Sequence, residues 1–345
     1  MESNEVRFGI IGCGVIAPWH AFGIEGSEGA GLVAVCDIIK EKAEALAEKN
    51  GSPKVYTDYK ELLADPEVDA VCICIPSGLH AKIGIDAAKA GKHVLSEKPM
   101  DIKLENIDAL IEACHKANVK LGGVFQRRTS QNWIKVRDAV RGGKLGKMVL
   151  GDAYIKYYRS QEYYDSGDWR GTWELDGGGA LMNQGVHCID LLNWIMGPIE
   201  SIYAHAAPLV RNIEVEDTAV AAIKFANGAF GVLEGTTSVN PGLNHRLEFH
   251  GDKGSIRVEG EQIIEWSVPG EEMSESGDDT KDTAASNPTD IFKEGHRIII
   301  QDFVRAIQED RDPMVTGEEA RKAVELILAI YKSSKTGMPV TLPLK

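Results

Sequence analysis

The sequence has no excess of basic residues. It contains 38 lysines and arginines against 52 aspartates and glutamates, which gives a formal net charge of −14. This balance argues against binding to nucleic acid or to anionic membrane surfaces, because both attract basic proteins. No apolar run approaches the roughly 18 residues that predict a membrane span. The first five residues are polar and acidic, unlike a secretory signal, so we expect a cytoplasmic protein.

Cysteine is also scarce, with six residues in 345. Cys72 and Cys74 alternate within the apolar run VCICI, which is typical of a buried strand and not of a zinc knuckle. We therefore predict no metal site and reduced thiols. A chain of this length exceeds one ordinary domain core, so two domains are expected.

Residues 1–128 alternate short apolar runs with helical stretches, which predicts an α/β Rossmann domain with a doubly wound parallel sheet. Glycine or polar residues follow each run, and ligands bind beyond the carboxyl ends of such strands. The predicted strands are Phe8–Ile11, Leu32–Cys36, Ala70–Ile75, His93–Leu95 and Leu121–Phe125.

Residues 129–345 predict an α+β domain with a large, mostly antiparallel sheet. One helix, from about Gly179 to Met196, interrupts the strands. Residues 259–282 carry nine acids and one lysine, which favours an exposed loop. We expect the two late helices, 290–310 and 317–334, to pack back toward the first domain. The predicted strands lie at 148–158, 199–207, 218–225, 229–238, 245–250 and 255–258.

The segment Gly12–Ala17, GCGVIA, fits the dinucleotide pattern G-x-G-x-x-[G/A] and directly follows a predicted strand. Gly12 permits the tight turn, and Gly14 lets the backbone approach a pyrophosphate at the start of a helix. Asp37 ends the next strand, where its carboxylate accepts hydrogen bonds from ribose hydroxyls and repels a 2′-phosphate. NAD is therefore favoured over NADP, although the nearby Lys40 keeps NADP open.

Lys98 follows a predicted strand within Ser96–Pro99, where a lysine can stabilise the charge that develops on a substrate hydroxyl. Asn183 and His187 are four residues apart and share one face of the predicted helix. A histidine is the natural general base for removing a hydroxyl proton during hydride transfer. Asp190 either orients this imidazole or pairs elsewhere.

The stretch Arg159–Trp173, RSQEYYDSGDWRGTW, combines polar, aromatic and basic residues. Trp169 is a candidate to cover the nicotinamide. Arg159, Tyr163 and Arg170 are candidates to hold a polar substrate. A surface loop with buried aromatic rings would show the same composition.

At this point the sequence resembles the glucose–fructose oxidoreductase/inositol dehydrogenase family, Gfo/Idh/MocA. The resemblance implies that Lys98 and His187 are the catalytic pair. Many members carry an aspartate four residues before the histidine, where this chain has Asn183, which cannot accept a proton. The matching motifs are GIIGCGVIA at 9–17, CIPSGLH at 74–80, GKHVLSEKP at 91–99 and GGGALMNQGVHCIDLL at 177–192.

Within that family, residues 161–187 and 212–220 are most similar to UDP-N-acetylglucosaminuronate 3-dehydrogenases, which oxidise a C3 hydroxyl with NAD. Residues 126–128, QRR, also fit a charged substrate. For the cofactor we predict contacts from Gly12, Gly14, Val15, Ile16, Asp37, Pro76, Ser77, His80, Glu97, Lys98, Gln126 and Trp169. For the substrate we predict contacts from Lys98, Arg128, Arg159, Tyr163, Arg170, Asn183 and His187.

The leading hypothesis is an NAD-dependent oxidoreductase that transfers a hydride between nicotinamide and a secondary hydroxyl of a sugar or sugar nucleotide. A second enzymatic hypothesis is an inositol or free-monosaccharide dehydrogenase. A third hypothesis is a non-catalytic NAD-binding sensor, which would predict the loss of Lys98 or His187, although both are present. A fourth is a hydrolase that oxidises its substrate transiently. The resemblance further implies a homo-dimer or homo-tetramer that associates through an apolar face of the second domain's sheet.

Overall fold

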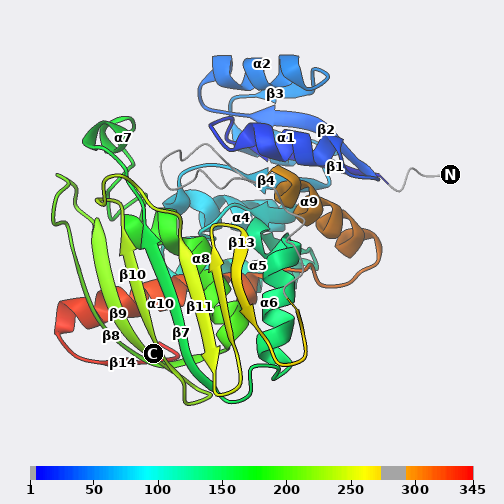
Figure 1. Ribbon diagram of the computed structural model, residues 1–345. Coiled ribbons are helices and arrows are strands. Elements are labelled where there is room, and N and C mark those ends of the chain that lie inside the picture. Colours follow the sequence, from blue (N-terminus) through cyan, green and yellow to red (C-terminus); the bar gives the residue numbers. More distant parts are fainter. Residues whose placement is uncertain (1–4, 273–292, 345) are drawn as a thin grey trace. The chain divides into compact units, whose positions relative to one another are not determined.

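The computed structural model describes residues 5–272 and 293–344, which form two compact units (Figure 1). The first unit contains the described residues up to Gln126 and those from 293 to Arg321. The second unit contains Arg127 to residue 272 and Lys322 to residue 344. The predicted boundary after residue 128 lies close to this division, and the helix predicted at 290–310 belongs to the first unit.

The first unit contains a six-stranded sheet in the order β3-β2-β1-β4-β5-β6, and every neighbouring pair is parallel. Strand β4 is buried along its whole length, as expected for a parallel strand covered on both faces. The sequence analysis missed β3, because three half-exposed residues carry little periodicity. The strands are β1 Val6–Ile11, β2 Ala30–Cys36, β3 Lys54–Tyr56, β4 Ala70–Ile73, β5 His93–Ser96 and β6 Leu121–Gly123.

Helices connect these strands, as the doubly wound pattern requires. Helix α9 joins this unit from far along the chain and packs against α1. The helices are α1 Ala17–Glu25, α2 Lys40–Lys49, α3 Tyr59–Ala64, α4 His80–Lys89, α5 Leu104–Ala117, α9 Lys293–Gln308 and the first part of α10 Gly317–Thr336, with 3₁₀ turns η1 Ser77–Leu79 and η2 Gln126–Thr129.

The second unit contains an eight-stranded sheet in the order β13-β12-β11-β7-β10-β9-β8-β14. Among its described strands, β7 and β10 pair in parallel and the other neighbours are antiparallel. The strands are β7 Met148–Lys156, β8 Ile199–Ala207, β9 Thr218–Phe225, β10 Phe230–Thr236, β11 Arg246–Gly251, β12 Ser255–Glu259, β13 Gln262–Ser267 and β14 Val340–Thr341.

The prediction of an exposed acidic loop at residues 259–282 was wrong for its first part, which forms β13. Ile263 and Trp266 of this strand are buried. The carboxylate of Glu265 contacts Arg257 on β12 at 3.3 Å, so cross-strand pairing balances an acid that resembles loop charge in the sequence. Residues 273–282 lie outside the described part of the chain.

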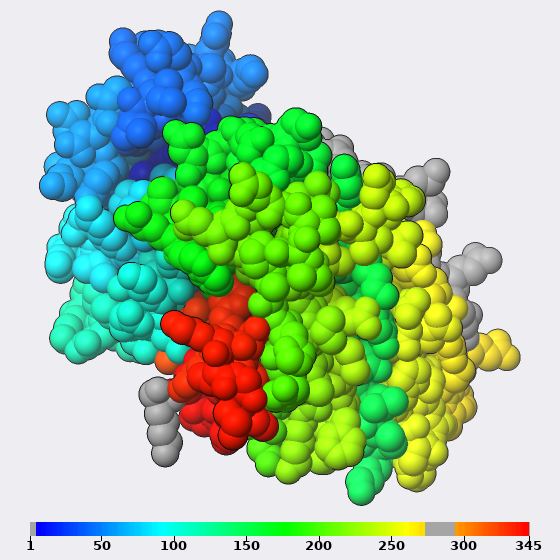
Figure 2. All heavy atoms as spheres, turned by 90° about the vertical axis from the view of Figure 1, so that its left-hand side faces the viewer, coloured from blue at the N-terminus to red at the C-terminus, as the bar shows by residue number. Residues whose placement is uncertain are grey.

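One face of this sheet is buried and the other is open. Strand β9 alternates between the two faces, with buried Ala221 and Ile223 between exposed Val220 and Lys224. Figure 2 looks onto the open face, where the strands from red β14 to yellow β13 form the surface. The remaining helices of the unit are α6 Gln131–Arg141, α7 Gln161–Asp165, the π-helix η3 Ala180–Gly185 and α8 Val186–Met196.

The predicted helix 179–196 is not uniform, because it opens with the π-helix η3 before α8. The buried carboxylate of Glu216 accepts the backbone N–H groups of Gly179 at 3.1 Å and Leu181 at 2.8 Å, and the Tyr331 hydroxyl at 2.9 Å. A Cβ at Gly178 would collide with Tyr331, and one at Gly179 with the Glu216 backbone. The glycine run therefore admits these neighbours of the same unit.

Glu216 makes folding depend on pH. Burial raises the pKa of its carboxyl to about 7, although its hydrogen-bond donors oppose the shift. Between its ordinary value of 4.5 and about 7, the folded protein binds more protons at this site than the unfolded chain. The contribution of Glu216 to the free energy of unfolding therefore decreases as pH rises through this window, by on the order of 3 kcal/mol.

Glu216→Gln should flatten this part of the pH dependence, because an amide does not titrate. Urea unfolding of both proteins from pH 4.5 to 8 measures the difference. Glu259→Gln on the exposed end of β12 is the matched control and should retain the wild-type slope. Parallel curves for the wild type and Glu216→Gln would contradict this assignment.

Candidate active site

The glycine loop follows β1 and opens α1, as the dinucleotide pattern predicts. Gly12 has a φ of +94°, and a Cβ there would collide with the Cys74 carbonyl. At Gly14 a Cβ would meet nothing within 4 Å, so the space beside its backbone is open. Val15 is 64% exposed, and Ile16 is the N-cap residue of α1. The loop thus offers accessible backbone at a helix N-terminus, which suits a pyrophosphate.

Asp37 follows β2 and is fixed by two backbone groups. Its Oδ2 accepts the Cys13 N–H at 2.8 Å, and its Oδ1 accepts the Ile39 N–H at 2.8 Å. Each carboxylate oxygen can accept more than one hydrogen bond, so both retain capacity for ribose hydroxyls. The carboxylate is therefore held beside the glycine loop where the sequence pattern expects it.

The loop after β5 carries Lys98, which is half-buried. Glu97 is buried, and its carboxylate accepts the Lys98 N–H at 3.1 Å and contacts His20 Nε2 at 2.9 Å. The ring of His80 lies between two carbonyl oxygens, those of Pro99 and Ile75. Both ring nitrogens of His80 and the carboxylate of Glu97 thus have partners within the protein. The cofactor contacts predicted for these two residues stay predictions.

The other predicted cofactor residues of the first unit follow β4 and β6. Pro76 is half-buried, and Ser77, 6% exposed, begins the η1 turn. Gln126 is 8% exposed at the start of η2. The carboxyl ends of parallel strands therefore gather the glycine loop, Asp37, Ser77, Lys98 and Gln126 at one edge of the first sheet.

In the second unit, Asn183 lies in η3 and His187 in the first turn of α8, and both are half-buried. The Asn183 amide donates to Asp176 Oδ1 at 2.7 Å, and its Oδ1 accepts from Gln184 at 2.9 Å. A π-turn separates the two residues, so the α-helical spacing used for the sequence prediction does not apply here. Such turns are frequent at functional sites.

Gln184 joins Asn183 to the predicted substrate residues. Its Oε1 accepts from Arg159 at 2.8 Å, and its Nε2 donates to the Tyr163 hydroxyl at 2.9 Å. Arg170 also donates to that hydroxyl, at 2.6 Å, and its guanidinium lies 4.5 Å from the centre of the Trp169 ring. The structure therefore brings Asn183, Arg159, Tyr163, Arg170 and Trp169 into one network. Sequence reasoning missed its two connectors, Asp176 and Gln184.

Arg128, a predicted substrate residue, has a carboxylate partner within the second unit. It is 3% exposed and forms a bidentate pair with Asp190, with distances of 2.8 and 2.6 Å. Pairing away from the imidazole was one of the two roles predicted for Asp190. The substrate contact of Arg128 stays a prediction. Arg127 likewise contacts a carboxylate, that of Glu261, at 2.6 Å.

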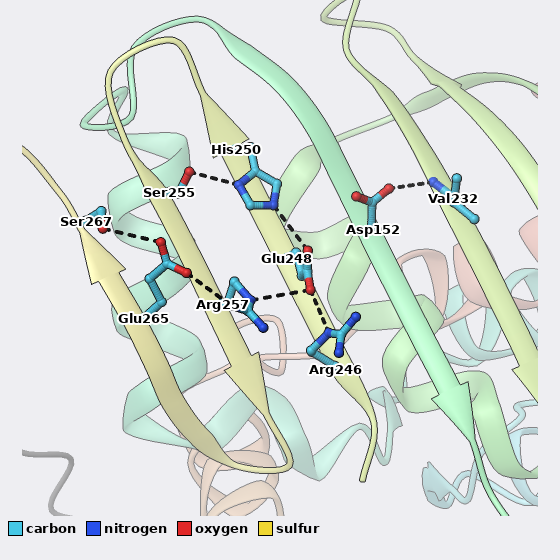
Figure 3. A network of polar contacts seen from close by, with 9 residues as sticks. All are labelled: Asp152, Val232, Arg246, Glu248, His250, Ser255, Arg257, Glu265 and Ser267. Carbon is cyan, nitrogen blue, oxygen red and sulfur yellow. Dashed lines mark hydrogen bonds and ion pairs between the residues drawn. The ribbon is translucent and has the colours of Figure 1, made fainter. Parts of the chain in front are cut away.

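The open face of the second sheet carries a group of possible metal ligands, Asp152, Glu248 and His250 (Figure 3). Glu248 also contacts Arg246 at 2.6 Å and Arg257 at 3.4 Å. Two guanidinium groups already supply positive charge to this carboxylate, so the arrangement favours an ion-pair network over a metal site.

Profiles of one oxidoreductase family match both parts of the chain. The profile for the NAD-binding Rossmann fold matches residues 6–124, and that for the C-terminal alpha/beta domain matches residues 137–342. Among curated proteins, myo-inositol 2-dehydrogenase of Thermotoga maritima is 30% identical, over 95% of this chain and 96% of its own length.

Solved structures of WlbA dehydrogenases are similar to the whole chain. The enzyme from Bordetella pertussis, in complex with NADH and UDP-GlcNAcA, is 35% identical with a TM-score of 0.89, over 99% of this chain and 100% of its own. The enzyme from Chromobacterium violaceum, in complex with the same two molecules, is 33% identical with a TM-score of 0.89, over 100% of this chain and 98% of its own.

These similarities favour an enzyme over a non-catalytic sensor. Among the described residues, no helix is both long and apolar enough to span a membrane. The protein is an NAD-binding oxidoreductase of the sugar-dehydrogenase type. With both of its domains matched, the chain belongs to the Gfo/Idh/MocA oxidoreductase family.

Proposed function

We propose that this protein oxidises the C3 hydroxyl of UDP-N-acetylglucosaminuronate with NAD. The observation that carries this proposal is the similarity, over 99% of the chain, to a WlbA dehydrogenase in complex with NADH and UDP-GlcNAcA. The arginines of the second unit support it, because a uronate and a diphosphate are both anionic. Arg159 and Arg170 lie in one network with Asn183, a predicted substrate residue.

We assign Lys98 and His187 different roles at the substrate hydroxyl that is oxidised. His187 accepts the hydroxyl proton, and the ammonium of Lys98 stabilises the negative charge that develops on the oxygen. When bound, NAD would accept the hydride that leaves the carbon bearing this hydroxyl. Asn183 cannot accept a proton, so it orients the hydroxyl while His187 carries the base function.

Inositol oxidation is the second candidate, favoured by the myo-inositol 2-dehydrogenase similarity. A neutral polyol gains little from a guanidinium, whereas a carboxylate or phosphate gains a charged hydrogen bond. The change in KM for each substrate when one arginine is removed therefore distinguishes the two candidate functions.

Arg170→Ala should raise KM for UDP-N-acetylglucosaminuronate by roughly 10–100-fold, the loss expected for a hydrogen bond to a charged group. NADH absorbance with this substrate and with myo-inositol measures the effect. Arg137→Ala, on α6 of the same unit, is the matched control and should leave KM unchanged. Faster turnover of myo-inositol than of the sugar nucleotide by the wild type would favour the second candidate instead.

His187→Ala and Lys98→Ala should each lower kcat by about 10²–10⁴-fold, the usual contribution of a positioned acid or base, with NAD affinity retained. The wild-type rate should rise with pH near neutrality, as the histidine loses its proton. That limb should vanish in His187→Ala and persist in the exposed control His115→Ala. A limb unchanged in His187→Ala would assign the base to another group, with Lys98 and Tyr163 next.

We also propose a homo-dimer or homo-tetramer formed through the open face of the second sheet. Apolar side chains of this face on β8–β10 include Tyr203, Val220 and Phe230, which are 41%, 46% and 59% exposed. The ion pairs of Figure 3 occupy β11–β13, so the face is only partly apolar. A two-fold axis perpendicular to the strands would place β8–β10 of one copy against β8–β10 of the other.

Phe230→Glu should dissociate this assembly, because the substitution buries carboxylates at the contact. Light scattering at micromolar concentration should show a dimer or tetramer for the wild type and a smaller species for the variant. Phe22→Glu, at an exposed phenylalanine of α1 in the first unit, should leave the mass unchanged. A monomeric wild type would rule out the proposal.

A further inference from the structure

We propose that His20, His80 and His296 are positioning residues for Lys98, which they hold by fixing the groups on both sides of it. The three side chains lie in the first unit and are at most 1% exposed. The inference rests on the catalytic role proposed above for Lys98. It assigns a purpose to buried titratable groups that the reaction itself does not use.

The first point of attachment is Glu97, on the N-terminal side of Lys98. Its Oε1 lies 2.9 Å from His20 Nε2 and 3.4 Å from His296 Nε2, while its Oε2 accepts the Lys98 N–H at 3.1 Å. Burial opposes ionisation, but His20 and His296 hold the pKa of the Glu97 carboxyl well below its usual range. Glu97 is therefore a carboxylate, and the lysine's own peptide N–H is bound to a fixed acceptor.

The second point of attachment is the Pro99 carbonyl, on the C-terminal side. His80 Nδ1 lies 2.7 Å from this oxygen, and His80 Nε2 lies 2.7 Å from the Ile75 oxygen. Each ring nitrogen of His80 therefore lies within hydrogen-bond distance of a backbone carbonyl oxygen. His80 thus joins the segment after β4 to the segment that carries Lys98.

The three histidines come from three different helices, α1, α4 and α9. The α1 and α9 rings meet edge to face with centroids 5.5 Å apart. Lys98 is consequently tied to the helix that opens after the glycine loop and to the helix that returns from late in the chain. A displacement of about 1 Å at a catalytic group can cost about 100-fold in rate, so such bracing has catalytic value.

A metal ion is the competing explanation for His20, Glu97 and His296, whose ligand atoms lie within 4.8 Å of one another. Zinc bonds of about 2.0–2.1 Å in tetrahedral geometry place ligand atoms well over 3 Å apart. The 2.9 Å contact between His20 and Glu97 is instead a hydrogen-bond distance. The geometry therefore favours direct contact between the side chains.

The test replaces each histidine by leucine, which removes its N–H donors, and by glutamine, which keeps one. Steady-state kinetics give kcat and KM, and peptide mass spectrometry gives the rate at which acetic anhydride acetylates Lys98. Each leucine variant should lower kcat by about 10–100-fold with KM nearly unchanged, and should change the Lys98 acetylation rate. The glutamine variants should recover part of both, and His115→Gln on the exposed face of α5 should change neither.

The acetylation rate separates this inference from the proposed function. Full activity in Lys98→Met would overturn the role of Lys98 in catalysis, whereas altered acetylation in the histidine variants would still show that they position it. Acetylation at the wild-type rate in folded glutamine and leucine variants would overturn the inference, as would one equivalent of tightly bound metal in the purified protein. If a leucine variant fails to fold, its glutamine variant decides.

Discussion

Backbone N–H groups in buried loops must find acceptors without the help of water, and this constraint organises the whole candidate site. The protein meets it with carboxylates. Each one fixes a segment that carries a predicted functional residue, and each lies outside the helices and strands. The pairs are Asp37 with Cys13, Glu97 with Lys98, Asp176 with Gly171, and Glu216 with Gly179 and Leu181.

These buried carboxylates differ in charge state because different hydrogen-bond donors contact them. Imidazole nitrogens beside Glu97 outweigh the cost of burial and keep its pKa low, whereas Glu216, with backbone and tyrosine donors, has its pKa raised to about 7. The carboxylate of Glu97 thus accepts the backbone N–H of Lys98 as a charged group. At Glu216, ionisation lowers the free energy of unfolding. The contribution of this residue, which binds the start of η3, therefore decreases as pH rises.

Local patterns were sufficient to predict the parallel sheet, the glycine loop and Asp37, because these depend on neighbouring residues and on a strong hydrophobic period. Local patterns failed where the structure depends on contacts between residues far apart in the sequence. The acids of β13 look like loop charge until Arg257 is placed opposite Glu265. The pairing of Arg128 with Asp190 has no local signal, and neither does the contact of His20 and His296 with Glu97, since only the fold brings these residues together.

The side-chain amide of Asn183 is held on both sides by residues of the second unit. Its Nδ2 group donates to the Asp176 carboxylate. This bond and the one from Gln184 fix which side of the amide is oxygen. Asn183 therefore has a defined orientation without a titratable proton.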